Sequence, residues 1–406
     1  MTTCRICDKN FEPFISFGDM PIANGFLAEK DFSDEYFFGL ATGFCEHCNM
    51  VQLIDQPARE MMFHDEYAFF SSLSSGMRNH FAEFAEKLQA EFLISDDPFA
   101  VEIGSNDGIM LKNIAQAGIR HLGVEPSANV AQVASDNGVN TISSFFDEAL
   151  AAQIIADYGH ADTITSANVI CHIPYLHSVF AGIETLLKPT GVFIYEDPYL
   201  GDIVEKVSYD QIYDEHVFFF SVMSVSKLAA MHNMEVFDVE HLSTHGGSMR
   251  YYIAKKGSHP ISENVARQLQ KEQQLGLDQA NTYDELRKRI EKSRTDLVAI
   301  LEKIKAETGK PVVAYGATSK STTVTNYCGI GPDLIDYICD TTPLKQGKFS
   351  PGSHIPVKPY EDFLADYPDY TLLFAWNHSK EIMAKEEAYN KHGGKWIVYV
   401  PEVKIT

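Results

Sequence analysis

Residues 99–126 carry the pattern that decides the fold. The segment begins with the apolar run FAVEI at 99–103. It continues with GSNDG at 104–108 and a stretch of helical apolar spacing, and it ends with HLGVEP at 121–126. The apolar run predicts a buried strand, and the glycines allow a tight turn where a ligand can approach the backbone. We therefore expect a strand–helix–strand unit whose loop lies at the carboxyl edge of a parallel sheet, where such folds bind ligands.

The glycine spacing of this loop favours a ligand without a phosphate at that point. Dinucleotide folds use Gly-x-Gly-x-x-Gly so that a pyrophosphate rests on a helix N-terminus, whereas here Asp107 stands between Gly104 and Gly108. An acid would repel a phosphate, but it suits a ligand with a positive end, such as S-adenosylmethionine. Glu102 favours the same ligand, and so does Glu125, which ends the second strand and can accept hydrogen bonds from both ribose hydroxyls. A plain α/β turn that happens to hold acids is the alternative.

Length and composition predict a soluble, globular chain of two or three domains. The chain has 406 residues, 45% of them hydrophobic, and a net charge of −23. So acidic a surface repels nucleic acid and anionic lipid over most of its area, and an anionic substrate would need a local basic pocket. Neither an apolar run of membrane-spanning length nor a signal-peptide pattern is present, so a cytoplasmic location is expected. No obligate protein partner is inferred.

Two CxxC pairs mark residues 1–66 as a separate domain. Cys4 and Cys7 form the first pair, and Cys45 and Cys48 form the second. Four thiolates at this spacing can converge on one tetrahedral ion, which predicts a closed, structural Zn²⁺ site. The metal would substitute for a core too small to hold itself together. A redox function for CxxC is the alternative, but it requires one pair at a helix start rather than two pairs in a small strand-rich region.

From residue 98 the pattern alternates between strand and helix, which predicts an α/β fold with a doubly wound parallel sheet. Strands are expected near 99–103, 121–125, 139–142, 162–168 and 191–197, with helices at 107–117, 127–137, 147–157 and 175–188.

Polar and aromatic groups follow several of these strands. Phe145 and Phe146 could flank an adenine ring, Asn168 and His172 follow the fourth strand, and Tyr199 follows the fifth. Each residue by itself could be an ordinary loop group. Because the strand ends share one edge of the sheet, the set is better explained as a site.

The motif YDEH at 213–216 combines groups suited to proton transfer. His216 could accept a proton, Glu215 could hold its tautomer, and the Tyr213 phenol could donate to a developing enolate oxygen. A hydrogen-bonded core histidine is the alternative. Further on, HGGSMR at 245–250 exposes backbone N–H groups, and Ser248 and Arg250 could bind a phosphate. A hairpin turn would produce the same Gly-Gly signal.

The remainder of the chain predicts linking helices and a second α/β unit. Thr282 and Glu285 form a capping-box pattern ahead of an apolar stripe that Gly309 ends. Strands are expected at 312–315, 335–339, 371–376 and 396–400. The loop GATSKSTT at 316–323 is small and hydroxyl-rich, which suits a phosphate at a helix start. Lys320 and Lys345, with Lys348, could form a local anion trap, and a solvated loop is the alternative.

The order of these motifs resembles the sugar C-methyltransferases of deoxysugar and branched-sugar biosynthesis. The resemblance rests on the two CxxC pairs and on the motifs GSNDG, NVICHIP at 168–174, EDPYL at 196–200, YDEH, HGGSMR, GATSK, KQGKFSPG at 345–352 and AWN at 375–377. It implies a Rossmann-like S-adenosylmethionine methyltransferase domain at 67–256, preceded by the zinc-binding domain. Residues 257–406 would hold the linking helices and a second Rossmann-like domain that binds the sugar nucleotide.

The resemblance also implies a reaction and a set of site residues. Members methylate C3 of nucleotide-linked 4-keto-6-deoxyhexoses, with His216 as the implied base and Tyr213 as the donor to the C4 oxyanion. The chain departs from the family pattern at Phe69, Tyr175 and Asp214, which bears on the exact sugar. The residues expected at the cofactor are Glu102, Gly104, Asn106, Asp107, Glu125, Pro126, Phe146, Asn168 and His172. Those expected at the sugar nucleotide are Phe69, Tyr199, His245, Ser248, Arg250, Lys320, Asp340, Lys345 and Asn377.

Other functions remain open from the sequence. A relative that binds the nucleotide sugar or the cofactor without turnover would show the same motifs, and so would an enzyme that methylates another sugar position. An oxidoreductase with two Rossmann-like halves is disfavoured, because neither glycine loop reads Gly-x-Gly-x-x-Gly.

Overall fold

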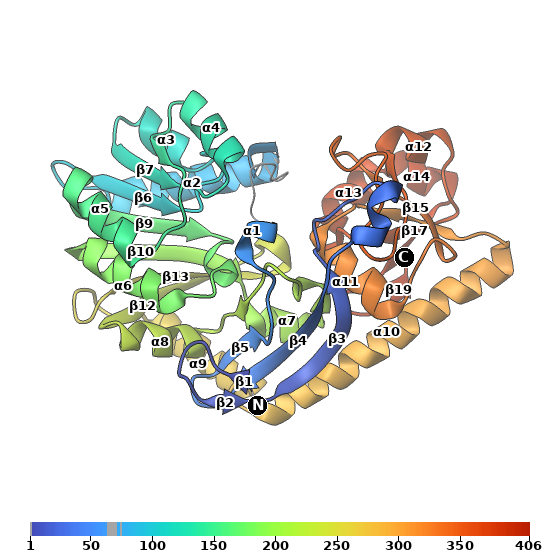
Figure 1. Ribbon diagram of the computed structural model, residues 1–406, viewed down its shortest axis with the longest axis horizontal. Coiled ribbons are helices and arrows are strands. Elements are labelled where there is room, and N and C mark those ends of the chain that lie inside the picture. The colour runs from blue at the N-terminus through green and yellow to red at the C-terminus, as the bar shows by residue number, and fades with distance from the viewer. Residues whose placement is uncertain (1, 63–70, 74) are drawn as a thin grey trace.

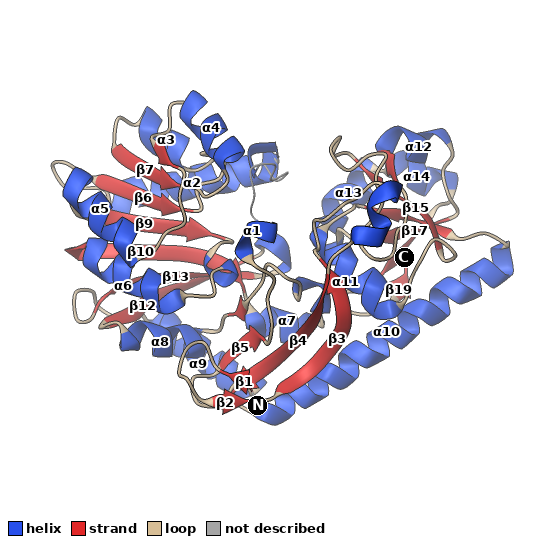
Figure 2. Cartoon of the chain, in the orientation of Figure 1, coloured by secondary structure: helices blue, strands red, loops and turns tan. Residues whose placement is uncertain are grey.

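The computed structural model describes residues 2–62, 71–73 and 75–406. The chain forms two lobes, each built around its own sheet, and the long helix α10 (Ala280–Thr308) runs from the base of the N-terminal hairpin along the underside of the second lobe (Figure 1). A hairpin from the N-terminal region crosses from one lobe to the other (Figure 2). Within the described ranges, no helix combines the length and apolar character needed to cross a membrane.

The N-terminal region is a small antiparallel unit. Its sheet has the order β11-β5-β4-β3, and a separate two-stranded ladder joins β1 to β2. The strands are β1 (Thr2–Thr3), β2 (Asn10–Phe11), β3 (Pro13–Pro21), β4 (Phe37–Cys45), β5 (Met50–Leu53) and β11 (Phe218–Phe219). Strand β11 lies far along the chain, and Phe218 pairs with Gln52. This pairing brings the segment just before β11 against the N-terminal region.

The first lobe contains a seven-stranded sheet of order β12-β13-β10-β9-β6-β7-β8. Its members are β6 (Phe99–Ile103), β7 (Arg120–Val124), β8 (Thr141–Ile142), β9 (Ala161–Ala167), β10 (Leu187–Pro198), β12 (Met234–Leu242) and β13 (Ser248–Lys255). Strands β6 to β10 are parallel, and β13 pairs antiparallel with β10 and β12. The predicted doubly wound parallel sheet is confirmed, with an antiparallel edge added.

Helices cover both faces of this sheet (Figure 1). They are α2 (Ser75–Glu91), α3 (Leu111–Gln116), α4 (Ala128–Asp136), α5 (Glu148–Tyr158), α6 (Leu176–Leu186), α8 (Val222–Met231) and α9 (Glu263–Leu275). Helix α3 begins later than the predicted residue 107. The reason is local, because Asn106 and Gly108 both have positive φ, which extends the turn past the glycine motif.

Helix α10 confirms one prediction and corrects another. The predicted apolar stripe is buried, and Gly309 ends the helix in the left-handed conformation. The predicted capping box is wrong. The helix begins at Ala280, and the Thr282 hydroxyl donates to the carbonyl oxygen of Gly276 at 2.7 Å. That carbonyl belongs to the turn that ends α9, so Thr282 fastens the α9–α10 corner instead of capping α10.

The second lobe contains a six-stranded sheet of order β16-β15-β14-β17-β18-β19. Its strands are β14 (Val312–Tyr315), β15 (Ile335–Asp340), β16 (Val357–Pro359), β17 (Tyr370–Leu373), β18 (Lys395–Val398) and β19 (Lys404–Ile405). Its helices are α11 (Ser319–Cys328), α12 (Tyr360–Ala365), α13 (Ser379–Lys385) and α14 (Glu387–His392). All pairings except β18–β19 are parallel, as the predicted second α/β unit requires.

The hairpin β3–β4 shares its hydrophobic core with the second lobe. Phe17 of β3 lies edge-on to Tyr327 of α11 and is stacked on Tyr209. Tyr209 begins the short helix η4 (Tyr209–Gln211), which precedes the YDEH motif. The packing therefore places this motif between the lobes. The predicted boundaries after residues 66 and 256 stay a prediction.

Candidate active site and zinc centre

The four cysteines of the N-terminal region converge on one point. The sulfurs of Cys4 and Cys48 are 3.5 Å apart, and those of Cys7 and Cys45 are 3.4 Å apart. All four sulfurs lie within 4.8 Å of one another as free thiols. A tetrahedral Zn–S₄ site with bonds of about 2.3 Å has sulfurs about 3.8 Å apart, so the cluster fits a zinc ion. The Gln52 amide donates to the Cys4 sulfur at 3.0 Å and orients this ligand.

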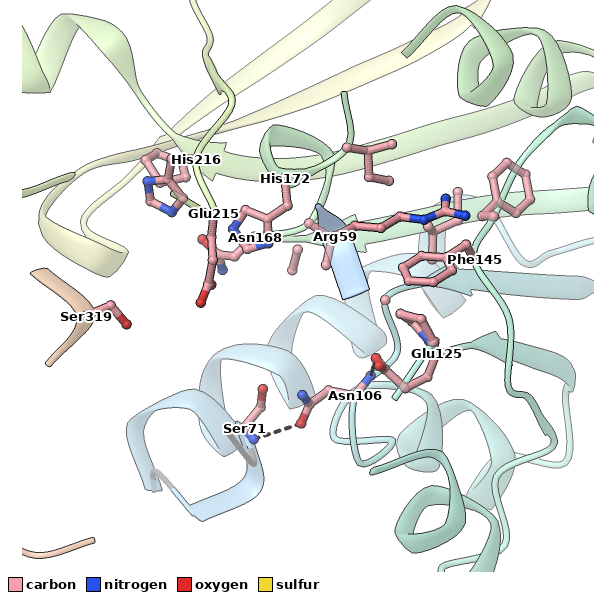
Figure 3. Close-up of a pocket in the computed structure, with 18 of the residues that line it drawn as sticks. Arg59, Ser71, Asn106, Glu125, Phe145, Asn168, His172, Glu215, His216 and Ser319 are labelled. Carbon is pink, nitrogen blue, oxygen red and sulfur yellow. Dashed lines mark hydrogen bonds between the residues drawn. The ribbon is translucent and has the colours of Figure 1, made fainter. Parts of the chain in front are cut away.

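A cavity of about 260 Å³ opens at the carboxyl edge of the seven-stranded sheet, between the lobes. Residues of the N-terminal region, the first lobe and the second lobe all line it. The labelled side chains in Figure 3 show this: Phe145 and Glu125 lie at one end, and Glu215 points toward Ser319 at the other.

The turn after β6 has the conformation that its glycines predict. Gly104 has φ of +70° and lines the cavity. A Cβ at this position would lie 2.3 Å from Cγ2 of Val169, so both the backbone and the available space require glycine. Asn106 and Pro126 line the same wall.

Glu125 ends β7 with its carboxylate on the cavity wall. One oxygen accepts from the Asn106 backbone N–H at 3.0 Å and the other from the Ser127 N–H at 2.9 Å. Burial raises the pKa of this carboxyl group, while the two backbone N–H donors oppose that shift. Each oxygen keeps a further lone pair, so Glu125 can accept hydrogen bonds from two vicinal hydroxyls, as a ribose requires.

Glu102 and Asp107 are not among the residues that line the cavity, and their contact with the cofactor stays a prediction. Glu102 is buried within β6, and its desolvation, together with the nearby Glu125 and Asp107 charges, raises its pKa well above the ordinary value. Asp107 accepts a hydrogen bond from the Ser72 N–H at 3.1 Å. Asn106 likewise accepts from Ser71 at 2.9 Å. Asp107 and Asn106 thus hold η2 (Ser71–Leu73) against the turn.

The cavity wall opposite Glu125 is aromatic and cationic. Phe145 and Phe146 both line it, as do Asn168 and His172. The Arg59 guanidinium of α1 (Arg59–Met62) lies 4.1 Å from the Phe145 ring centre, and it donates to the Tyr175 hydroxyl at 3.1 Å. The sequence analysis missed Arg59, since its local pattern carries no signal for this contact.

The YDEH segment forms a hydrogen-bonded group at the middle of the cavity. Nδ1 of His216 lies 2.7 Å from the carbonyl oxygen of Gln211, and Nε2 lies 2.9 Å from the Tyr213 hydroxyl. A carbonyl oxygen only accepts, so Nδ1 carries the proton and Nε2 presents a lone pair. Burial and the neighbouring His172 lower the pKa of His216 well below its usual value, which keeps the ring neutral.

Glu215 does not hold the tautomer of His216, contrary to the sequence-based prediction. The Gln211 carbonyl takes that place, and Glu215 instead accepts from the Asn24 amide at 2.7 Å. The Asn24 side-chain oxygen accepts from the Ser319 hydroxyl at 2.9 Å. Burial raises the pKa of Glu215 to about 7. Asn24 was missed because it lies 191 residues from Glu215 in the chain.

Two of the residues predicted at the sugar nucleotide, His245 and Lys320, line the cavity. The His245 carbonyl accepts from the Gln211 amide at 2.7 Å and from the Lys320 ammonium at 3.3 Å. Asp340 and Lys345 lie beside the GATSK loop. The Asp340 carboxylate accepts from the Ala317 N–H at 2.7 Å, and Lys345 donates to the Ala317 carbonyl at 2.6 Å. Neither belongs to the cavity lining, and neither does Asn377.

The predicted phosphate site at HGGSMR is wrong. Residues 243–247 connect β12 to β13 as a hairpin, with Leu242 opposite Ser248. The Arg250 guanidinium is buried against Glu196, with contacts of 3.0 and 2.7 Å, and lies 4.0 Å above the Phe84 ring centre. The Ser248 hydroxyl donates to the Thr244 carbonyl.

Tyr199 also lies away from the cavity. It is fully buried, and its hydroxyl donates to Glu272 at 3.0 Å. The hydrogen bond to Glu272 therefore engages the hydroxyl that the motif offered to a substrate. Phe69 lies outside the described residues.

Comparison with known proteins defines the class. Family models match residues 77–239 as "Methyltransferase domain", 4–63 as "Putative zinc binding domain" and 243–401 as "C-methyltransferase C-terminal domain". With the fold and the cavity described above, the chain is an S-adenosylmethionine-dependent methyltransferase with an N-terminal zinc-binding domain.

The particular family follows from a full-length match. The chain is 34% identical over 405 residues to C-methyltransferase NovU of Streptomyces niveus, a match that covers 99% of this chain and 96% of that one. The chain belongs to this C-methyltransferase family. A ubiquinone biosynthesis O-methyltransferase of Burkholderia cenocepacia is 32% identical over 94 residues, covering 23% of this chain and 40% of that protein.

Solved structures give a partial match. Magnesium protoporphyrin IX methyltransferase from Synechocystis with bound S-adenosylmethionine aligns with 45% of this chain and 80% of its own at 14% identity, with a TM-score of 0.33.

Proposed function

We propose that the protein methylates C3 of a nucleotide-linked 4-keto-6-deoxyhexose and thereby forms a branched-chain sugar. The observation that carries the proposal is the neutral His216, whose lone pair on Nε2 faces the hydroxyl of Tyr213 inside the cavity. A C–H bond next to a ketone is acidic enough for such a base.

The residues divide the chemistry between them. Nε2 of His216 takes the C3 proton, while the electron pair of that bond moves toward the C4 carbonyl and forms an enolate. The Tyr213 hydroxyl donates to the C4 oxyanion as the charge develops. Bound S-adenosylmethionine supplies the methyl group that C3 acquires. Orientation of the two reactants by the cavity walls accounts for much of the rate.

Two residues of the second lobe favour a nucleotide-linked substrate. Lys320 brings a cation to the cavity from the start of α11, in a chain whose net charge is −23. An ammonium group at this position attracts a diphosphate that the acidic surface elsewhere repels. Ser319 adds a hydroxyl beside it on the same wall.

Deuterium exchange tests the proposal. The protein is incubated with a 4-keto-6-deoxy nucleotide sugar in deuterated water, with and without S-adenosylmethionine, and the sugar is analysed by NMR and mass spectrometry. We expect deuterium at C3 without the cofactor, and a product heavier by one CH₂ group with it. A methyl group at another carbon would reassign the position. Binding of both ligands without exchange or transfer would indicate a non-catalytic relative.

A further inference from the structure

A buried cysteine comes together with two histidines of the cavity wall. Cys171 and His172 belong to η3 (Ile170–His172), and His216 belongs to the YDEH segment. One ligand atom from each lies within 4.8 Å of the other two. The two imidazole rings are stacked, with centres 5.2 Å apart and planes at 21°. Among the described residues, this is the second such group besides the four cysteines.

The ligand set is chemically suited to a borderline divalent cation. Thiolate and imidazole are the ligands that Zn²⁺ and Co²⁺ prefer, whereas Mg²⁺ and Ca²⁺ require oxygen. His172 lines the cavity and offers an imidazole nitrogen to the group. His216 carries its proton on Nδ1 because of the Gln211 carbonyl, which leaves Nε2 for a metal.

The three ligand atoms are arranged as in a metal site, but they lie further apart than bound ligands do. In a tetrahedral site, sulfur and nitrogen ligands lie about 3.5 Å apart, so each pair here has to close by at most about 1.3 Å. We expect side-chain rotation to supply this movement. Since His172 and His216 both line the cavity, the fourth position faces space that a water molecule can fill.

We propose that Cys171, His172 and His216 form a second divalent-metal site, distinct from the four-cysteine centre, and that Zn²⁺ bound there inhibits the enzyme. On binding, the S–H bond of Cys171 breaks, its proton passes to the solvent and a metal–sulfur bond forms, with no change of oxidation state. The inhibitory part rests on the proposed function. A metal at Nε2 occupies the lone pair that would take the C3 proton, and it displaces the Tyr213 hydroxyl.

Cobalt provides a readout that does not depend on activity. The purified protein, with zinc in the four-cysteine centre, is titrated with Co²⁺ while zinc is counted by metal analysis. The zinc ion in the four-cysteine centre should remain, because such a site binds Zn²⁺ more tightly than Co²⁺. We expect one further equivalent of Co²⁺ and a thiolate-to-cobalt charge-transfer band.

Two matched cysteine variants locate this band. Cys171→Ala should lose both the band and the extra equivalent. Cys339→Ala, which removes another buried thiol from β15 in the second lobe, should retain them. If Cys171→Ala does not fold, His216→Gln serves in its place and should lose the extra equivalent. A band that persists in Cys171→Ala, or no extra equivalent in the unmodified protein, would overturn the proposal.

The inhibition is measured separately in the exchange assay. Zn²⁺ added beyond one equivalent should stop deuterium exchange, and a chelator that leaves the four-cysteine zinc in place should restore it. Exchange that continues at saturating Zn²⁺, in protein that binds Co²⁺ through Cys171, would refute the inhibitory part alone. Absence of exchange in metal-free buffer would instead count against the proposed function, while the cobalt result would stand.

Discussion

Both parallel sheets of this protein contain a glycine turn that is held by an acid at the end of the next strand, but the two turns have different surroundings. In the first lobe, Glu125 at the end of β7 accepts from the backbone N–H groups of Asn106 and Ser127. In the second lobe, Asp340 at the end of β15 accepts from those of Ala317 and Thr342, both at 2.7 Å. Glu125 therefore links the glycine turn after β6 to the turn after β7. Asp340 likewise links the glycine turn after β14 to the turn after β15.

The difference lies in what covers the acid. Glu125 faces the open cavity, whereas the corresponding turn of the second lobe is covered by Lys345, which donates to Ala317 and lies 4.7 Å from the ring centre of Phe26. Phe26 comes from the N-terminal region, beyond β3. One α/β turn thus stays available to a cofactor and the other is filled by protein. A local sequence motif therefore identifies such a turn, but the residues packed against the turn decide whether a ligand can reach it.

Removal of the base should produce the largest effect. We expect His216→Ala to lower the rate of C3 deuterium exchange by roughly 10²–10⁴-fold, the range typical of general base catalysis. Calorimetry should show S-adenosylmethionine affinity nearly unchanged, since Glu125 and Phe145 remain. Undiminished exchange would assign the base to another residue.

The two strand-end acids should differ in their effect on the cofactor. Glu125→Ala removes an acceptor on the cavity wall, and hydrogen bonds to a charged group contribute about 1.5–3 kcal/mol. We therefore expect S-adenosylmethionine to bind roughly 10- to 100-fold more weakly. Asp340→Ala is the matched control and should leave the cofactor affinity unchanged. Equal losses in both variants would contradict the distinction between the turns.

The glycines of the two turns should differ in their effect on stability. Alanine at either position adopts a positive φ, which costs about 1–2 kcal/mol. At Gly104 its Cβ would also lie 2.3 Å from Val169, whereas at Gly316 the nearest atom is the Cβ of Ala375 at 3.2 Å. We expect the free energy of unfolding in urea to fall by about 1–3 kcal/mol more for Gly104→Ala than for Gly316→Ala.

Asn24 joins the two lobes, and its removal should have a smaller effect. Asn24→Ala loses the hydrogen bonds to Glu215 and Ser319. We expect kcat/KM to fall about tenfold, in line with one lost hydrogen bond to a charged group. Ser319→Ala removes only the second of these bonds and should have less effect. A drop in Ser319→Ala as large as in Asn24→Ala would show that the contact with Glu215 is unimportant.

The pH profile should show the smallest change. The pKa of His216 is lowered, so its Nε2 becomes protonated only as the pH falls well below 6.5. The acid limb of kcat/KM for exchange should therefore have its midpoint below pH 6.5. Glu215, with a pKa of about 7, also titrates near this range. The Glu215→Gln variant should retain the same acid limb, and a limb that disappears in it would assign the titration to Glu215.

The sequence predicted the features that depend on local pattern. The strand and helix alternation, the turn at 104–108 and the α10 stripe all follow from the apolar period and from glycine positions. The cysteine spacing likewise predicted the metal cluster. Errors concentrated where a polar residue had a distant partner, as Arg250 has in Glu196 and Tyr199 in Glu272.

By itself, then, the sequence determined the two α/β units, the zinc centre and the acid that ends β7 on the cavity wall. Only the tertiary structure decided which polar groups reach the cavity. Pairing of β11 with β5 brings the YDEH segment against Asn24, and Gln211 rather than Glu215 orients His216. The physical reason is that most buried polar groups take a partner, and the partner available to each depends on segments far away in the chain.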